Sequence, residues 1–425
     1  MKFIYTVLFV TMFLQINGQE SANHGAPKFA PPDGRKLLII GQDLGAIGGL
    51  ISHQDGYVDS FTCHIPAGVT SYTSLPSLSG LTSLANWGSG DVRAQAYLED
   101  ETFDNSFIVI GLYLVGSLDG IIGGFTDSSI RDFATWVKGQ DRPVFIRIGY
   151  EFEGPWNNYD PTKFKNAWKH IVHVFDEEEV RNAAYVWQSA GLNYNNIINW
   201  YPGDNYVNWV AYSQFDGTNM GQSIKNFAEE HDKPIMIAEA TPRVDLQNGN
   251  ADSHWNSWYR PLFDGIYAND RIKALAYINT DWDSQSMWNG QGWGDSRVQE
   301  VPFLKNKWET EVKTEPWITG TDSLMGIINY EDWLITSITK PNQNDLSNEI
   351  LIKKMEGQIQ LNRKDGKMIN GIKVWGYLGR LLFYNNTPAF QYSISTNQFP
   401  QGAVILSIEL ENRIVTRKEI IIHNN

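Results

Sequence analysis

Short apolar stretches alternate with amphipathic helical patterns from about residue 37 to about residue 283. Eight of these stretches have the length and the β-branched or aromatic content of strands. They are Lys36–Gly41, Phe61–Ile65, Phe107–Leu112, Val144–Tyr150, Ala183–Gln188, Asn208–Ser213, Ile235–Glu239 and Ala274–Asn279. Eight strand–helix repeats over about 250 residues predict an α/β fold, the (β/α)8 TIM barrel, whose functional groups lie at the carboxyl ends of the strands.

Two of the intervening helices have clear start signals. Asp127 begins a segment with polar capping residues, and apolar side chains then recur at helical spacing up to Val137. Pro161 begins a second helix, whose apolar stripe runs from Phe164 to Phe175. Both helices fit between successive strands of the predicted barrel.

From about Ile350 onward the pattern changes to short alternating strands separated by turns, which predicts a separate β-sandwich of about 75 residues. The predicted organisation has four parts along the chain. They are a signal peptide at 1–20, the barrel at 30–320, a linker or irregular segment at 321–345 and the β-sandwich at 346–425.

The first residues have the layout of a secretory signal peptide. Lys2 precedes the apolar run Phe3–Leu14, and small and polar residues follow around Gly18. A membrane anchor is the alternative, but the run is well below the roughly 20 residues that a spanning helix needs. We therefore expect a secreted or cell-surface protein whose mature form has no membrane span.

Charge and cysteine content narrow the class of protein further. The formal net charge of -14 argues against nucleic acid and anionic membranes as partners. Cys63 is the only cysteine, so the fold has no internal disulfide, and we expect a monomer stabilised by its core. The 16 Trp and 19 Tyr fit either a large core or a cleft in which sugars stack on aromatic rings.

Two carboxylates end predicted strands that lie across the barrel from each other. Glu151 follows the fourth strand and Glu239 ends the seventh. Arg147 shares the strand parity of Glu151 and is expected to point into the barrel near a carboxylate. Two carboxyl groups roughly 5–5.5 Å apart are the catalytic pair of a retaining glycosidase. The alternative is that each Glu is an ordinary solvated strand end.

Other candidate groups are weaker. Glu153 has the same parity as Glu151 and is the alternative acid, while Asp204 and Asp216 are candidates for substrate contacts. The His residues have no metal-ligand spacing, and neither a phosphate-binding Gly-rich loop nor a Gly-x-Ser-x-Gly elbow is present. We therefore expect no cofactor and no metal.

Three segments, Arg147–Trp156, Trp200–Val210 and Ile237–Glu239, resemble landmarks of glycoside hydrolase family 26. That clan A family contains mainly β-mannanases, along with β-1,3-xylanases and mixed-linkage glucanases. The resemblance covers roughly residues 37–283 and implies a retaining, internally cleaving glycanase. It makes Glu151 the acid/base and Glu239 the nucleophile.

The resemblance and the strand positions together indicate a set of substrate contacts, including a groove-lining loop at 201–206 and an aromatic platform after the eighth strand. The expected contacts are Arg147, Tyr150, Glu153, Trp156, Trp187, Tyr201, Asp204, Tyr206, Tyr212, Arg243 and Trp282.

Several positions differ from the family pattern and leave the substrate open. Tyr150 replaces the usual His, Glu153 the usual Asn, and Ala240-Thr241 the usual Phe-Gly. A β-mannan-type or related glycan is the first expectation, and a marine algal polysaccharide, with or without sulfate, is the alternative. Arg243 and Arg260 are candidates for sulfate or uronate groups, or else surface ion-pair partners. A non-catalytic glycan-binding barrel and a polysaccharide lyase are further alternatives.

The C-terminal segments Leu378–Leu382, Phe399–Val404 and Thr416–Ile421 resemble the sorting domain of the type IX secretion system. This resemblance implies a Bacteroidetes-type source and export through that secretion machinery. A carbohydrate-binding module is the alternative interpretation.

Overall fold

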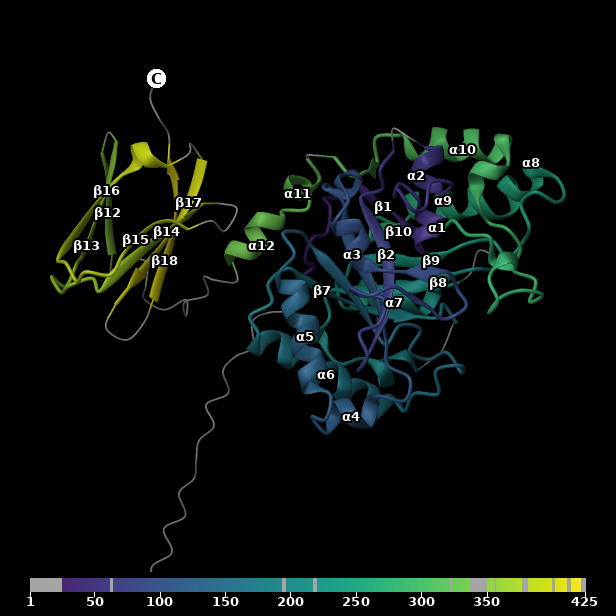
Figure 1. Cartoon of the computed structure of the whole chain (residues 1–425), viewed down its shortest axis with the longest axis horizontal. Helices are drawn as coiled ribbons and strands as arrows, with labels where there is room; N and C mark the ends of the chain where they lie inside the picture. The colour runs from purple at the N-terminus through teal and green to yellow at the C-terminus, as the bar shows by residue number, and fades with distance from the viewer. Residues whose placement is uncertain are drawn as a thin grey trace, which may run out of the picture.

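The computed structural model describes most of the chain, and the predicted signal peptide and Cys63 lie outside the described residues. The described ranges are 25–61, 64–192, 196–216, 220–321, 323–336, 350–355, 357–376, 381–399, 402–410 and 414–421. Figure 1 shows a large body built from the described residues between 25 and 336, and a smaller C-terminal body of strands.

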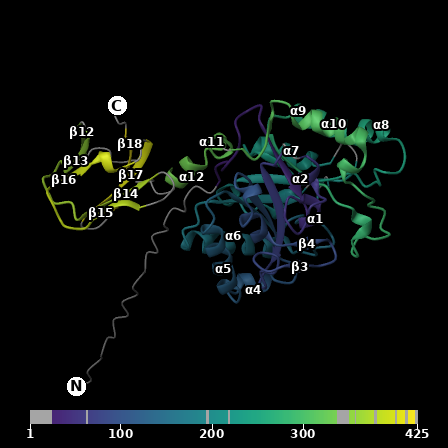
Figure 2. The ribbon, with the colours of Figure 1, turned by 45° about the horizontal axis from the view of Figure 1, so that its top comes forward.

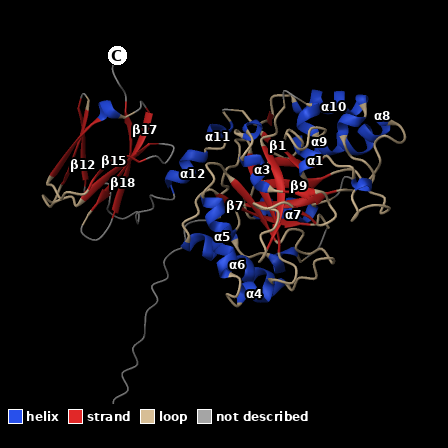
Figure 3. Cartoon of the chain, viewed as in Figure 1, coloured by secondary structure: helices blue, strands red, loops and turns tan. Residues whose placement is uncertain are grey.

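Eight parallel strands form the larger body, shown in red within its helices in Figure 3. They are β1 (Lys36–Gly41), β2 (Gly68–Ser74), β5 (Phe107–Tyr113), β6 (Val144–Ile148), β7 (Ala183–Ser189), β8 (Trp209–Gln214), β9 (Ile235–Ala240) and β10 (Ile272–Ile278). Each strand pairs with the next, and β10 pairs with β1, so the sheet closes into the predicted TIM barrel. The short strand β11 (Trp317–Ile318) adds to β1 outside the ring.

The predicted second strand was wrong. The strand begins at Gly68, after the predicted stretch Phe61–Ile65, and Phe61 instead ends helix α2 (Tyr57–Ser60). The Phe61 ring packs on Tyr57, with the ring centroids 4.5 Å apart. Strand β2 carries buried polar residues such as Thr70 and Thr73, so it lacks the apolar signal of its neighbours.

Helices connect the strands and cover the barrel. They are α1 (Leu44–Ile47), α2, α3 (Ala94–Leu98), α4 (Leu118–Ile122), α5 (Asp127–Lys138), α6 (Pro161–Glu177), α7 (Gln222–Glu230), α8 (Ala251–His254), α9 (Arg260–Tyr267), α10 (Pro302–Val312), α11 (Leu324–Ile327) and α12 (Tyr330–Thr336). Both predicted helix starts are confirmed, and the Asp160 side chain caps α6 by accepting from the Lys163 backbone N–H. Figures 1 and 2 show α4, α5 and α6 side by side on one flank.

The barrel interior is filled from its amino-terminal end by apolar side chains of alternate strand positions. Phe29 and helices α11 and α12 pack against this layer, with Leu324, Ile328 and Tyr330 buried in the same cluster. The segment 321–345, predicted to be a linker or irregular, therefore includes helical turns that close one end of the barrel.

The C-terminal body is a β-sandwich, as predicted. Its strands are β12 (Ile350–Met355), β13 (Gln358–Arg363), β14 (Gly371–Gly376), β15 (Leu381–Asn385), β16 (Gln391–Ser395), β17 (Gly402–Glu409) and β18 (Ile414–Ile421). They form a sheet of order β12-β13-β16 and a second of order β15-β14-β17-β18. Side chains of both sheets, including Leu361 and Leu406, share a core of their own. Among the described residues, no helix is long and apolar enough to cross a membrane.

Candidate active site

The carboxyl-terminal layer of the barrel interior is polar, although the layer beneath it is apolar. Along β6, β7 and β8 the inward positions after the apolar core are Arg147, Gln188 and Ser213, all of them fully buried. Each lies two residues beyond an inward apolar side chain, as the period of a strand requires. Three neighbouring strands thus place a cation, an amide and a hydroxyl in one layer.

A bulge in β9 brings Glu239 to the same layer. Met236 and Ala238 face the interior with the barrel core, and simple alternation would turn Glu239 outward. The pairing with β8 shifts by one residue here, so that Tyr212 lies opposite Ile237 and Ser213 lies opposite Glu239. The extra residue re-aims the carboxylate to the inside of the barrel, a recognised use of β-bulges next to active sites.

Two donors bond the same oxygen of Glu239. Arg147 Nη1 lies 2.5 Å from Glu239 Oε1, and the Tyr72 hydroxyl donates to the same oxygen at 3.0 Å. The Arg147 guanidinium also lies 5.0 Å from the ring centroid of Tyr72 and 5.2 Å from that of Tyr150. A buried guanidinium this close favours the charged form of a carboxylate.

Glu151 reaches the site by a turn. Strand β6 ends at Ile148, and both Gly149 and Glu151 have a φ of +54°, in the left-handed region. Asn157 holds the turn, because its side-chain amide donates to the backbone oxygens of Tyr150 and Glu151 at 3.0 and 2.9 Å. Such a backbone costs about 1–2 kcal/mol for a residue with a Cβ and is typical of functional turns.

Hydrogen bonds also fix both oxygens of the Glu151 carboxyl group. Ser213 Oγ donates to Oε1 at 2.7 Å, and the Trp156 indole N–H donates to Oε2 at 3.0 Å. Burial, and then the charge of Glu239, raise the pKa of Glu151 to about 8. Glu151 is therefore protonated at neutral pH, as a general acid must be.

A continuous chain of hydrogen bonds joins the two carboxyl groups. Arg147 Nη1 donates to Gln188 Oε1 at 2.9 Å, and Gln188 Nε2 donates to Ser213 Oγ at 3.1 Å. Glu239 lies at one end of this chain and Glu151 at the other. The two groups are thus positioned by the same rigid polar layer.

Both carboxylates line one cavity of about 850 Å³. Aromatic side chains from the ends of strands and from the loops above the barrel make up much of its wall. They are Tyr72, Trp87, Tyr113, Tyr150, Trp156, Phe215, Trp282, Trp288 and Trp293. Such a cavity, with apolar rings and a few convergent polar groups, suits the faces and hydroxyls of a sugar chain.

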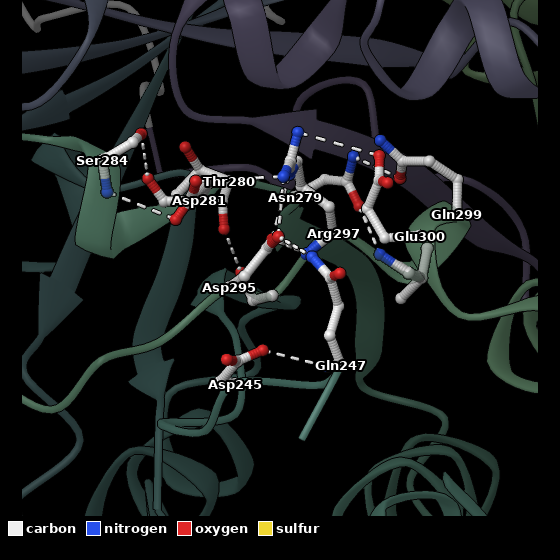
Figure 4. A network of polar contacts seen from close by, with 12 residues as sticks. Asp245, Gln247, Asn279, Thr280, Asp281, Ser284, Asp295, Arg297, Gln299 and Glu300 are labelled. Atoms are coloured by element: carbon white, nitrogen blue, oxygen red, sulfur yellow. Dashed lines mark hydrogen bonds and ion pairs between the residues drawn. The ribbon is translucent and has the colours of Figure 1, made fainter.

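A polar network anchors the long loop that follows β10 (Figure 4). Arg297 makes two hydrogen bonds to the buried Asp295 at 2.9 and 2.7 Å, and Asn279 donates to Gln299 at 2.9 Å. Gln247, from the loop after β9, donates to Asp295 at 2.8 Å. The network joins the loops that follow β9 and β10. It therefore supports Trp288 and Trp293, which the loop after β10 contributes to the cavity wall.

Several residues predicted from the sequence do line this cavity: Glu151, Glu239, Tyr150, Trp156, Asp216, Arg243 and Trp282. The Arg243 guanidinium lies 4.5 Å from the ring centroid of Trp293 and 3.7 Å from the Asp216 carboxylate. Its charge is thus already partly paired. Arg260, the other candidate for sulfate, is exposed on α9 and does not line the cavity.

Arg147 and Glu153 have roles other than the predicted substrate contact. Arg147 lies in the polar layer and contacts Glu239 instead of lining the cavity. Glu153 is buried outside the cavity, where it accepts hydrogen bonds from the Ser189 hydroxyl and the Ala190 backbone N–H. These contacts favour Glu151 over Glu153 as the acid.

Four aromatic residues and Asp204 were also expected at the substrate but lie elsewhere, which corrects the prediction. Trp187 stacks on Phe152 with the ring centroids 4.4 Å apart, and Tyr201 packs against Trp187. The predicted groove loop folds onto α7 because Asp204 accepts from Tyr201 at 2.8 Å and pairs with His231 at 2.9 Å.

The remaining two aromatic residues belong to the outer surface of the barrel. Tyr206 borders a separate surface pocket, where the Lys169 ammonium lies 5.2 Å from its ring centroid. Tyr212 faces outward on β8, under the Lys225 ammonium of α7. Both rings therefore pack against neighbouring side chains and do not line the cavity that holds the two glutamates.

Sequence reasoning missed several residues of the site. Gln188 and Ser213 share the inward parity that indicated Arg147, so parity could have found them. Tyr72 was missed because its strand was misplaced, and Trp87, Trp288 and Trp293 lie in loops that carry no local signal. Among the described residues, no group of three or more His, Cys, Asp or Glu side chains is arranged to hold a metal ion.

Comparison with known proteins agrees with this geometry. Residues 118–277 match the model of glycosyl hydrolase family 26. The β-1,3-xylanase TXYA of a Vibrio species is 29% identical over 328 residues, which cover 70% of this chain and 69% of that protein. A β-1,3-xylanase of an Alcaligenes species is 28% identical over 332 residues, covering 71% and 68%.

A solved structure has a similar fold. The catalytic domain of a family 26 endo-β-1,4-mannanase from a Bacillus species superimposes with a TM-score of 0.50 at 17% identity, covering 70% of this chain and 90% of that one. The closed barrel, the paired glutamates and these similarities define a glycoside hydrolase. Residues 118–277, the segment that matches the family 26 model, include both Glu151 and Glu239.

Proposed function

We propose that this protein is a retaining glycoside hydrolase that cleaves a β-1,3-xylan-type polysaccharide internally. The observation that carries the proposal is one aromatic cavity lined by both Glu239, which bonds the buried Arg147 guanidinium, and Glu151, whose pKa is raised to about 8. Two carboxyl groups in opposite protonation states are what a glycosidase needs at neutral pH.

The proposed reaction has two steps. Glu239 attacks the anomeric carbon, and the bond to the glycosidic oxygen breaks as Glu151 gives that oxygen its proton. Glu151, now ionised, then takes a proton from water, whose oxygen attacks the anomeric carbon and releases Glu239. The product keeps the configuration of the substrate, which proton NMR of the first-formed anomer can test.

The choice of substrate rests on the two β-1,3-xylanases, which align over about two thirds of their length. A mannan is the second candidate, supported by the fold shared with a family 26 mannanase. Purified protein assayed on β-1,3-xylan, β-1,4-xylan, mannan and sulfated algal glycans, with products analysed by mass spectrometry, distinguishes these substrates. Products of many lengths early in the reaction support internal cleavage.

Glu239→Ala tests the nucleophile. Loss of the attacking carboxylate should lower kcat by about 10⁴-fold or more, because removing a nucleophile abolishes the covalent route. Added azide should restore turnover and give a product of inverted configuration, which a merely unfolded variant would not do. Turnover like that of the wild type would contradict the assignment.

Glu151→Ala separates the acid/base from its neighbour Glu153. Loss of the acid should slow hydrolysis of unactivated polysaccharide by about 10²–10⁴-fold, while an aryl glycoside with a good leaving group still forms the intermediate. Glu153→Gln is the matched control, because its carboxylate bonds Ser189 and Ala190 outside the cavity. Should Glu153→Gln show the substrate-dependent loss instead, the roles are reversed.

We also propose that the protein is exported and that the β-sandwich is its sorting domain. The C-terminal sequence resemblance and a sandwich with its own core support this proposal. Fusion of residues 346–425 to a periplasmic reporter in a bacterium with type IX secretion should move the reporter outside the cell. Binding of the isolated sandwich to polysaccharide, with no export, would instead support a carbohydrate-binding module.

A further inference from the structure

A hairpin between β2 and β5 carries Trp87 to the wall of the cavity. Its two short strands, β3 (Ala85–Asn86) and β4 (Asp91–Val92), pair in antiparallel fashion. The Trp87 side chain is 44% exposed and yet lines the same cavity as both glutamates. A partly exposed indole on the wall of this largely aromatic cavity presents a flat apolar face on which a sugar ring can stack.

The hairpin is fixed from two sides. Gln42, after β1, donates from its side-chain amide to the Ser89 backbone oxygen at 3.1 Å. On the other side, the Met287 backbone N–H, from the loop after β10, donates to the Gly88 oxygen at 2.8 Å. Two loops distant in sequence thus hold the turn that presents Trp87.

Glycines make these close contacts sterically possible. Gly88 has a φ of +92°, and a Cβ there would lie 2.8 Å from Ser286 Oγ. Gly90 has a φ of +94°, and a Cβ there would lie 2.4 Å from the Asp43 carboxyl carbon. Only glycine tolerates both a positive φ and neighbouring atoms this close. The two glycines therefore allow the hairpin turn to pack against the loops after β1 and β10.

The Trp87 ring is also held at its edge. A Cβ on Gly80 would lie 3.1 Å from Trp87 Cη2, so the indole rests against the Gly80 backbone. A ring whose backbone and edge are both fixed loses little conformational entropy when a sugar stacks on it. This is the arrangement of a preformed binding surface.

We propose that Trp87 is a sugar-stacking subsite remote from the bond that is cleaved, and that it sets the preference of the enzyme for longer chains. The hairpin contacts the loops after β1 and β10, whereas residues of β2, β6, β7 and β8 hold the two glutamates. On this proposal, a short substrate occupies the catalytic end without reaching Trp87. This inference rests on the proposed hydrolysis of a polysaccharide.

The test measures kcat/KM for β-1,3-linked xylo-oligosaccharides of increasing length, or for oligosaccharides of whichever polymer the wild type cleaves best. Trp87→Ala should lower the ratio of kcat/KM for long to short substrates by about five- to tenfold, a loss typical of one aromatic contact. Trp87→Tyr should recover most of the ratio, because it keeps a flat ring.

Two further variants separate stacking from folding. Phe125→Ala removes a side chain that is 89% exposed but lies outside the cavity, and it should leave the ratio unchanged. Gly88→Ala keeps Trp87 but displaces the clamped turn, and it should reproduce the loss of length preference. Melting temperatures of all variants confirm that they are folded.

A wild-type ratio in a folded Trp87→Ala variant would overturn the subsite, and so would an equal loss for every chain length. If the wild type cleaves no glycan at all, the proposed function fails first. Affinity electrophoresis on the same polymers then tests the subsite independently, because Trp87→Ala should still weaken retention relative to Phe125→Ala.

Discussion

Single residues in this barrel have their chemistry set by their partners. Glu151 and Glu239 are the same side chain, but Glu239 has a buried guanidinium and Glu151 has neutral donors. Burial and the neighbouring Glu239 raise the pKa of Glu151, which keeps the proton that a general acid donates. Environment and not residue type therefore assigns the two roles.

Ser213→Ala tests whether a hydrogen-bonding partner sets the pKa of Glu151. The Ser213 hydroxyl donates to Glu151 and favours its ionised form, so removing the hydroxyl should raise the pKa of Glu151 further. A higher pKa keeps the acid protonated to higher pH. The basic limb of the kcat/KM profile, near pH 8 in the wild type, should move upward.

The matched variant is Ser213→Thr, which retains a hydroxyl and should keep the wild-type limb. A structural defect alone would lower kcat/KM equally at every pH. A Ser213→Ala profile that keeps its shape, or whose basic limb moves downward, would therefore contradict the role of Ser213 as a positioning residue for Glu151.

At the scale of elements, the site depends on two irregular backbone features, a β-bulge and a left-handed turn. The bulge in β9 turns Glu239 inward, and the left-handed turn after β6 brings Glu151 into the cavity. Parity along a continuous strand predicted the position of Glu151, yet β6 ends at Ile148 and the turn decides that position. Tyr150 also lines the cavity, although alternation along a strand would turn it to the side opposite Glu151.

Arg297→Ala tests the network that anchors the loop after β10. The substitution leaves the buried Asp295 carboxylate without its two-point partner, which should lower the free energy of unfolding by about 1–3 kcal/mol. Denaturant unfolding measures the loss. Activity should fall at a lower temperature than in the wild type, because the loop carries Trp288 and Trp293.

Arg131→Ala is the matched control for that measurement. Arg131 also bonds two carboxylates, Glu177 and Glu178, but its side chain is 42% exposed on the helical flank. An exposed pair of that kind contributes little to stability, so Arg131→Ala should leave the free energy of unfolding nearly unchanged. Equal destabilisation by the two variants would show that burial of Asp295 does not decide the strength of the loop anchor.

At the scale of the whole molecule, the barrel and the sandwich have separate cores, and the barrel includes more of the chain than its strands suggest. Leu324 and Ile328 are fully buried in the cluster that closes the amino-terminal end of the barrel. The apolar pattern after residue 301 was too irregular to place these helices, because their partners lie on strands far away in sequence.

Two truncations test this boundary. A chain ending at Thr336 should melt close to the full-length barrel and keep its activity. A chain ending at Thr321 exposes the layer that Leu324, Ile328 and Tyr330 cover, a loss of about 5 kcal/mol that approaches the whole stability of a domain. Equal melting temperatures for the two barrels would contradict the structural role of α11 and α12.

The sequence by itself determined seven of the eight barrel strands, the barrel fold and which two glutamates follow or end the fourth and seventh strands, because buried strands and amphipathic helices need local apolar patterns. Only the tertiary structure decided which residues meet the cavity. Tyr201 and Asp204 looked like groove residues but pack on α7. Tyr72 and Ser213 instead bond the glutamates, and Gln188 links Ser213 to Arg147. The physical reason is that strand register, a bulge and loop packing place these side chains, and each depends on contacts between segments far apart in the chain.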